Sequence, residues 1–133
     1  MTDEMMTIRE MCDTFEVTPR TLRFYEAKEL LFPLRDGTKR LYGKADRARL
    51  KLILRGKRFG FMLEDIRQLL ELYDADEFHL TQLIETCEKG KERLADMVSQ
   101  KEELEIAIED LQAQLDWGAE RIAELKAKQT ATD

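Results

Sequence analysis

Residues 17–42 read VTPRTLRFYEAKELLFPLRDGTKRLY, and this stretch sets the fold that we expect for the chain. Thr18 and Pro19 predict the start of a helix, because a threonine hydroxyl caps the first turn and proline suits the first helical position. Further along, a turn at Asp36-Gly37 precedes the basic segment 39–42, KRLY. This order predicts a short helix followed by a small basic β-hairpin.

The short helix has a polar side that is rich in cations. Arg20, Thr21, Arg23 and Tyr25 are expected on its exposed side, and Leu22 on its apolar side. Two arginines with a threonine and a tyrosine favour an anionic partner. Together with the basic hairpin, they predict a recognition helix and a wing that contact DNA.

A second helix is expected just before this one. Thr7 and Glu10 fit a capping box, which predicts a helix from residue 7 to about residue 14. The turn at 16–17 then joins two short helices into a helix-turn-helix. Cys12 falls on the apolar side of the first helix and is interpreted as a small core residue.

Charge is divided between the two ends of the chain. The net charge is −6, but residues 1–62 carry fourteen Lys/Arg against nine Asp/Glu, and residues 63–133 carry eight against nineteen. Within residues 18–58 the ratio is thirteen to four. The basic front half is therefore expected to dock on a polyanion, because the acidic half would repel it.

Two further helices are predicted after the hairpin, over about 44–59 and 63–73, with a break between Gly56 and Gly60. The charged residues of the first are basic apart from Asp46, which predicts phosphate contacts for some of them.

From Leu80 the apolar residues follow a heptad repeat. With Leu80 at position a, eleven of the fourteen a and d positions up to Leu125 are apolar, which is typical of a coiled coil. The exceptions are Lys101 at position a and glycines 90 and 118 at position d. The predicted interface residues are Leu80, Leu83, Cys87, Leu94, Met97, Leu104, Ile108, Leu111 and Leu115.

Such an apolar stripe needs a partner helix, and too few residues remain for the chain to fold back on itself. A homodimer is therefore expected. Gly118 either ends the helix, kinks it or lies within it. The fold class is mostly α, with a winged helix-turn-helix domain over 1–75, a dimerisation coiled coil over 76–128 and a disordered tail over 129–133.

The motifs TPRTLRFYE, RLY and RGKRFGF, with LEDIRQLLELYD, closely resemble the DNA-binding domain of the MerR family of bacterial transcription regulators over residues 6–74. The resemblance implies a homodimer with an antiparallel coiled coil on a pseudo-palindromic promoter site. It also implies bending and untwisting of the promoter, with RNA polymerase nearby. One departure is Lys39, where the family commonly has an aromatic residue. The expected DNA-binding residues are Thr18, Arg20, Thr21, Arg23, Tyr25, Arg35, Lys39, Arg40, Tyr42, Lys57 and Arg58.

No metal and no cofactor is expected. Metal-sensing relatives use several cysteines around the dimerisation helix, whereas Cys87 is the last cysteine here and lies on the heptad seam. His79 beside Phe78 is interpreted as a surface or helix-start residue and not as a metal ligand. Trp117 is expected in plain interface packing or against the DNA-binding domain of the partner, and ligand binding is the less favoured alternative. The end of the chain soon after residue 125 argues against a large pocket for a drug, and any small effector is of unknown identity.

An enzyme is not expected, because one histidine and no phosphate-binding glycine loop leave little to carry chemistry. The alternative function is an acidic coiled-coil adaptor that binds another protein. It does not explain the thirteen basic residues between 18 and 58. Two cysteines, without a signal peptide or a membrane-length apolar run, predict a cytoplasmic location.

Overall fold

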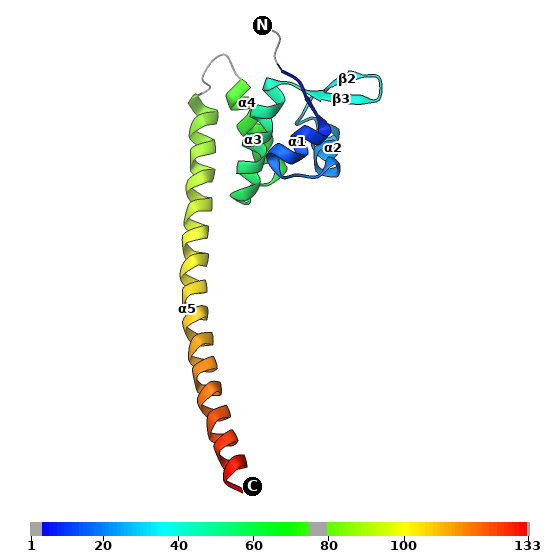
Figure 1. Cartoon of the computed structure of the whole chain (residues 1–133). Coiled ribbons are helices and arrows are strands. Elements are labelled where there is room, and N and C mark those ends of the chain that lie inside the picture. The colour runs from blue at the N-terminus through cyan, green and yellow to red at the C-terminus, as the bar shows by residue number, and fades with distance from the viewer. Residues whose placement is uncertain (1–3, 75–79, 133) are drawn as a thin grey trace. The chain divides into compact units, whose positions relative to one another are not determined.

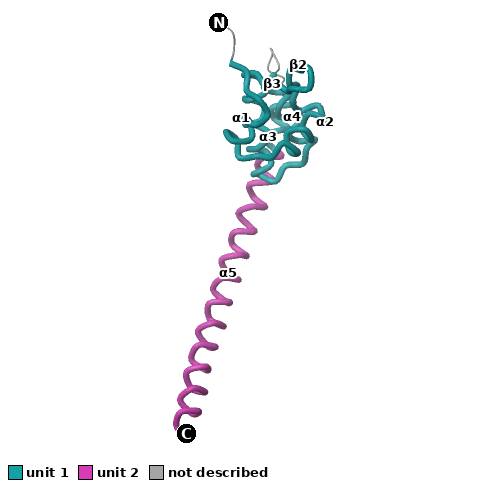
Figure 2. Tube along the Cα trace, turned by 45° about the vertical axis from the view of Figure 1, so that its right-hand side comes forward, with its two compact units in different colours: residues 1–88 teal, residues 89–133 magenta. Residues whose placement is uncertain are grey.

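The computed structural model describes residues 4–74 and 80–132. The chain divides into two compact units, residues 1–88 and residues 89–133 (Figure 2). No helix in the described part of the chain is both long and apolar enough to cross a membrane. In its described residues, 4–74 and 80–88, the first unit contains three short strands and four helices as well as the beginning of a fifth helix (Figure 1).

Two short helices form the helix-turn-helix, as predicted. They are α1, Ile8–Phe15, and α2, Pro19–Ala27. The capping box of α1 is present, since Thr7 Oγ1 accepts from Glu10 N at 3.2 Å and Glu10 Oε1 accepts from Thr7 N at 3.1 Å. Thr18 caps α2 through its side chain alone, with Oγ1 accepting from Thr21 N at 3.2 Å, and Pro19 is the first helical residue.

The hairpin belongs to a sheet of three strands, ordered β1-β3-β2 and antiparallel throughout. Its strands are β1, Met6–Thr7, β2, Leu34–Asp36, and β3, Lys39–Tyr42. Asp36 pairs with Lys39 across a two-residue loop that begins at Gly37, whose φ of +63° is a conformation that glycine adopts without strain. Strand β1 was not predicted, because a two-residue strand has no period to detect.

Two longer helices complete the first unit: α3, Lys44–Arg58, and α4, Leu63–Asp74. After α3 the chain reverses in a Schellman motif, in which Phe61 N donates to Gly56 O at 3.0 Å and Gly60 N donates to Lys57 O at 2.9 Å. Gly60 has a φ of +82° and ends the helix. Gly56 has another role, because a Cβ placed there would lie 2.7 Å from Cγ1 of Ile66 on α4.

One core holds these elements together. It contains residues from α1, α2, α3 and α4, from β3 and from the loop before β2. The leucines of that loop, Leu30 and Leu31, are buried in the core. Its members are Met11, Leu22, Tyr25, Leu30, Leu31, Tyr42, Leu50, Ile53, Ile66 and Leu70.

The fifth helix, α5, is continuous over Leu80–Thr132. It runs through Gly118 without a break, and residues 129–132 are helical where a disordered tail was expected. The residues that lead into this segment, 124–129 (ELKAKQ), are strong helix formers, and no proline or glycine follows Gly118 to stop the helix. The predicted domain boundary at residues 75–76 and the residues Phe78 and His79 lie outside the described residues.

Candidate nucleic-acid interface

The recognition helix α2 presents a cationic surface. Arg20 and Arg23 lie one turn apart, and both side chains are exposed. In the part of the chain that the structure describes, neither has a carboxylate within ion-pair distance. At the start of α2 the hydroxyls of Thr18 and Thr21 share a hydrogen bond of 2.9 Å. This end of α2 therefore combines two free guanidinium groups with two hydroxyls and the positive end of the helix dipole.

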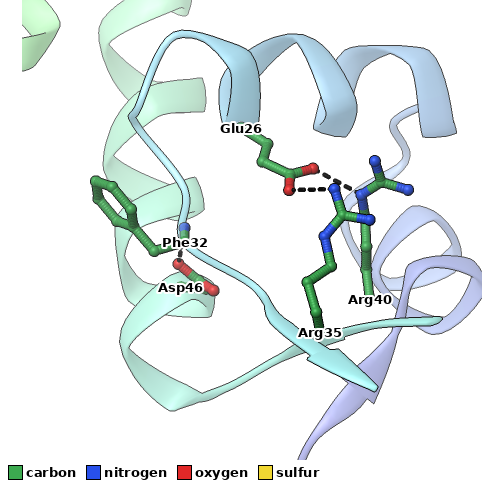
Figure 3. A network of polar contacts seen from close by, with 5 residues as sticks. All are labelled: Glu26, Phe32, Arg35, Arg40 and Asp46. Carbon is green, nitrogen blue, oxygen red and sulfur yellow. Dashed lines mark hydrogen bonds and ion pairs between the residues drawn. The ribbon is translucent and has the colours of Figure 1, made fainter. Parts of the chain in front are cut away.

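Glu26 joins the recognition helix to the wing, which is the β2–β3 hairpin (Figure 3). Its Oε2 accepts from Arg40 Nε at 2.6 Å, and its Oε1 accepts from Arg35 Nη2 at 3.0 Å. The Glu26 and Arg40 side chains are about four-fifths buried, whereas that of Arg35 is half exposed. Arg35 on β2 lies opposite Arg40 on β3, so the single Glu26 carboxylate binds both strands of the wing.

A second polar network fixes the loop that leads into the wing. The Asp46 carboxylate, buried near the start of α3, accepts from Phe32 N at 2.9 Å (Figure 3). Burial raises the pKa of Asp46, and the hydrogen bond from Phe32 opposes that rise. Arg49 donates from Nε to Leu30 O at 2.8 Å, pairs with Asp74 and lies over the Phe32 ring. Arg49 thus holds the fold together, although its residue type had suggested a phosphate contact.

Two predicted DNA contacts are wrong for this conformation. Tyr25 and Tyr42 were expected at the surface, but each is 0% exposed and lies in the core. The helical period places Tyr25 on the same side as Leu22, three residues earlier, and turns Phe24 outward instead. Both tyrosine hydroxyls are buried and have no hydrogen-bond partner within the described residues. Burial and the nearby Glu26 carboxylate raise the pKa of Tyr42.

The end of α3 brings further cations towards the recognition helix. Lys57 Nζ lies 5.9 Å from the centroid of the Tyr25 ring, so a residue thirty-two positions later in the chain adjoins α2. Arg58 follows at the last position of α3 and is exposed. Lys39, at the start of β3, is exposed as well. The predicted cations therefore come from the helix-turn-helix, the wing and the end of α3.

Two carboxylates that organise this surface, those of Glu26 and Asp46, were not predicted from the sequence. In the sequence, Glu26 is only one residue of the motif TPRTLRFYE, and Asp46 is only the acidic residue in the first turn of a basic helix. A signal for Asp46 was available, because a lone acidic residue among basic ones is a candidate for a buried partner. Glu26 gave no such signal, since its two arginine partners are nine and fourteen residues away.

The cysteines do not form a common site. Cys12 is half-buried, and burial together with the neighbouring Asp13 raises the pKa of its thiol, which disfavours the reactive thiolate. Cys87 is exposed on α5 of the single chain. Within residues 4–74 and 80–132, no three His, Cys, Asp or Glu side chains come together as a metal site requires.

The fold and its cationic face define a winged helix-turn-helix DNA-binding protein. Comparison with known proteins gives the same class. The family described as MerR HTH family regulatory protein matches residues 6–73, and the family described as MerR, DNA binding, matches residues 47–118. The HTH-type transcriptional regulator ZntR of Escherichia coli is 36% identical over 114 residues, which are 81% of this chain and 77% of that protein.

Solved structures show the same relationship. The transcription regulator PbrR691 from Ralstonia metallidurans CH34, in complex with lead(II), is 31% identical with a TM-score of 0.61, over 81% of this chain and 85% of that one. HiNmlR, a MerR family regulator lacking the sensor domain and bound to promoter DNA, has the same fold. Its TM-score is 0.63 at 22% identity, over 80% of each chain. The chain belongs to the MerR family of DNA-binding transcription regulators.

Proposed function

We propose that this regulator binds a pseudo-palindromic promoter site as a homodimer with an antiparallel coiled coil, and acts by bending and untwisting the DNA. The observation that carries the proposal is the exposed heptad seam of α5. Leu94, Leu104, Leu111 and Leu115 are each more than half exposed in the single chain. A stripe of that length on a helix of 53 residues requires a partner helix.

A dimer with two-fold symmetry would present two recognition helices, which is the arrangement that reads an inverted repeat. In each half-site we assign base contacts to Arg20 and Arg23, because arginine reads guanine through two hydrogen bonds in the major groove. The exposed hydroxyl of Thr18 and the side chains of Lys39, Lys57 and Arg58 are assigned to phosphates, together with Arg35 at the edge of the wing.

Rigid placement of the wing supports the distortion of the promoter. Untwisting a site costs a few kcal/mol, and phosphate contacts made at fixed positions can offset that cost. The ion pairs of Glu26 fix Arg35 and Arg40 relative to α2, so the wing and the recognition helix would act on the DNA as one body. RNA polymerase is the expected reader of the distorted promoter, and the cytoplasm is the expected location.

Footprinting of the purified protein on the promoters of its own gene and the neighbouring genes, at two salt concentrations, tests the proposal. We expect a protected inverted repeat between promoter elements, with a distorted centre. Binding should fall steeply with salt, by about 0.9 log units per phosphate contact for each decade of salt. Weak, even protection with no repeat would refute it and favour the adaptor that binds a protein through its acidic helix.

A further inference from the structure

A pocket opens at the base of the wing, where the β2–β3 hairpin meets the start of α3. Its volume is about 440 Å³, and all of the residues that line it belong to the first unit. Its apolar walls come from Met5, Phe32, Leu34 and Leu41. Phe32 and Leu34 are 62% and 63% exposed, so these walls are open to solvent. Large apolar side chains that gather in a hollow of this kind mark a binding surface.

The pocket is separate from the surface that we assign to DNA. None of the cations and hydroxyls assigned to base or phosphate contacts is among its lining residues. Its charged lining consists of two carboxylates, those of Asp46 and Asp74, and one guanidinium, that of Arg49. The lining as a whole is therefore negative, which disfavours a phosphate.

Asp46 supplies a buried carboxylate with one oxygen still available. The residue is 5% exposed, and its Oδ1 accepts from Phe32 N at 2.9 Å (Figure 3). Among the described residues its Oδ2 has no hydrogen-bond partner, and this atom is not enclosed by the protein. Burial is the main cause of the raised pKa of Asp46, so the carboxylate lacks the solvation that water would give it. A positively charged donor in the pocket would supply that missing interaction.

Arg49 does not supply it, because its guanidinium is engaged elsewhere. Its Nε donates to Leu30 O at 2.8 Å, and its Nη1 forms the ion pair with Asp74. The same guanidinium lies 5.2 Å from the centroid of the Phe32 ring. The Asp74 charge balances that of Arg49, which leaves the charge of Asp46 in the pocket. Arg49 lowers the pKa of Asp46 less than burial raises it.

This lining selects a ligand with an apolar body and one positive group. An anion would meet the charge of Asp46. A metal ion would find too few ligands, because no three His, Cys, Asp or Glu side chains come together within residues 4–74 and 80–132. The volume is within the range of about 300–1,000 Å³ that is typical of small-molecule sites. A primary ammonium suits the free oxygen of Asp46, since charge-assisted hydrogen bonds are stronger than neutral ones.

We propose that the pocket at the base of the wing binds a small organic ammonium ion, with its N–H donors on Asp46 Oδ2 and its apolar body against Phe32, Leu34 and Leu41. Leu34 and Leu41 lie opposite each other on β2 and β3. The ligand would therefore contact both strands of the wing. It would also contact the carboxylate that holds the loop before β2, so that α3, the loop and the wing share one ligand.

Two-dimensional ¹H–¹⁵N NMR of the full-length protein without DNA tests the site, with hexylammonium as the probe. The Phe32 amide is the reporter, because it donates to Asp46. We expect a saturable shift of the Phe32 and Leu34 amides, and no comparable shift with hexanol or hexanoate. Asp46→Asn should weaken hexylammonium binding about tenfold or more, while its amide oxygen can still accept from Phe32 N. Leu34→Ala should weaken it about threefold or more through lost apolar contact.

Glu71→Gln is the matched control, because it removes one exposed carboxylate of the same unit outside the pocket. It should bind hexylammonium as the unaltered protein does. Equal binding of hexylammonium and hexanol, or equal binding by Asp46→Asn and Glu71→Gln, would overturn the proposal, because the Asp46 charge would not be recognised. The absence of a saturable shift in the unaltered protein would also overturn it. Since DNA is not present, a missing footprint would refute the proposed function alone and would not alter this result.

Discussion

Glu26 in α2 accepts a hydrogen bond of 2.6 Å from Arg40 in β3, so one ion pair joins the recognition helix to the wing. The pair is mostly buried, and Glu26 also holds Arg35 at 3.0 Å. Arg35 and Arg40, which the sequence predicts as DNA contacts, therefore also form ion pairs within the protein. A wing held in this manner loses little conformational freedom on binding, which favours affinity.

Removing the Glu26 charge tests this relationship. Glu26→Gln keeps the size of the side chain but weakens both arginine contacts, and we expect a loss of about 1–3 kcal/mol in the free energy of unfolding. Urea denaturation of the full-length protein measures it. Glu71→Gln, at an exposed position of α4, is the control and should change little. Equal stability of the two variants would show that the wing does not depend on Glu26.

Base reading by the recognition helix can be measured residue by residue. Arg20→Ala and Arg23→Ala should each cost about 1–3 kcal/mol of operator binding if the arginine contacts a base, and should relax one base position. A phosphate contact would instead weaken binding to all sequences alike. Fluorescence anisotropy with operator and scrambled DNA separates the two results. Arg9→Ala, an exposed arginine of α1, is the control; unchanged affinity in both α2 variants would refute this placement of the recognition helix.

Local signals in the sequence were enough to predict α1, α2 and the wing. Caps and turns act within three or four residues, so Thr7, Thr18 and Gly37 identified their elements. The family assignment followed from motifs of the same short range. The heptad repeat also predicted a long helix, which the structure has. It did not show where that helix ends, because no proline or glycine follows Gly118 and strong helix formers continue to Gln129.

What failed was the assignment of residues to the two faces of α2 and β3. Arg23 and Tyr25 are two residues apart, and a helix turns about 200° between them, so they cannot share one face. Polar character had suggested that they did. For Tyr42 and Glu26 the outcome depends on contacts with residues far along the chain, which propensity and period do not encode. The structure therefore confirms the cationic face but moves both tyrosines into the core.

Packing between α3 and α4 depends on Gly56. Its added Cβ would lie 2.7 Å from Ile66 Cγ1 and 3.3 Å from Ile66 Cδ1, so either the Ile66 side chain or one of the two helices must shift. We expect Gly56→Ala to lower the free energy of unfolding by about 1–3 kcal/mol. Gly90→Ala is the comparison variant, since nothing lies within 4 Å of that position in the single chain and an alanine at this d position adds apolar surface to the proposed seam. Alanine in this helix should raise stability by about 0.5–1 kcal/mol. A stabilising Gly56→Ala in urea denaturation would contradict the close approach.

Asp46 predicts a pH dependence of stability with a definite sign. Its pKa in the folded protein is raised above the ordinary value of 3.8, chiefly by burial. The folded state therefore binds this proton more tightly than the unfolded state. The stability that Asp46 contributes is present below pH 3.8 and is lost as the pH rises through the folded pKa. Asp46→Asn should remove this decline, because an amide does not titrate.

Urea denaturation of the original protein and of Asp46→Asn, from below pH 3.8 upward, measures this pH dependence. The difference between their free energies of unfolding at each pH isolates the contribution of Asp46. The amide oxygen can still accept from Phe32 N, so the loop before the wing should remain in place. Asp46→Ala removes the acceptor and should cost about 1–3 kcal/mol for the unsatisfied Phe32 N–H. If the difference in free energy of unfolding between the original protein and Asp46→Asn did not vary with pH, Asp46 would not be the titrating group.

The heptad position of a residue on α5 predicts its effect on dimerisation, whereas the exposure of its side chain in the single chain does not. Leu111 and Ile106 are similarly exposed in the single chain, at 61% and 68%, but Leu111 is at position d and Ile106 at position f. Each leucine buried at the seam stabilises the dimer by about 1.5–3 kcal/mol, and a symmetric dimer contains two of them. Leu111→Asp should therefore weaken dimerisation by about 100-fold or more and abolish the footprint. Ile106→Asp should leave the dimer intact, because its side chain lies outside the seam. Sedimentation over a range of concentrations distinguishes the two variants, and equal effects would mean that the pairing surface of α5 is not the heptad seam.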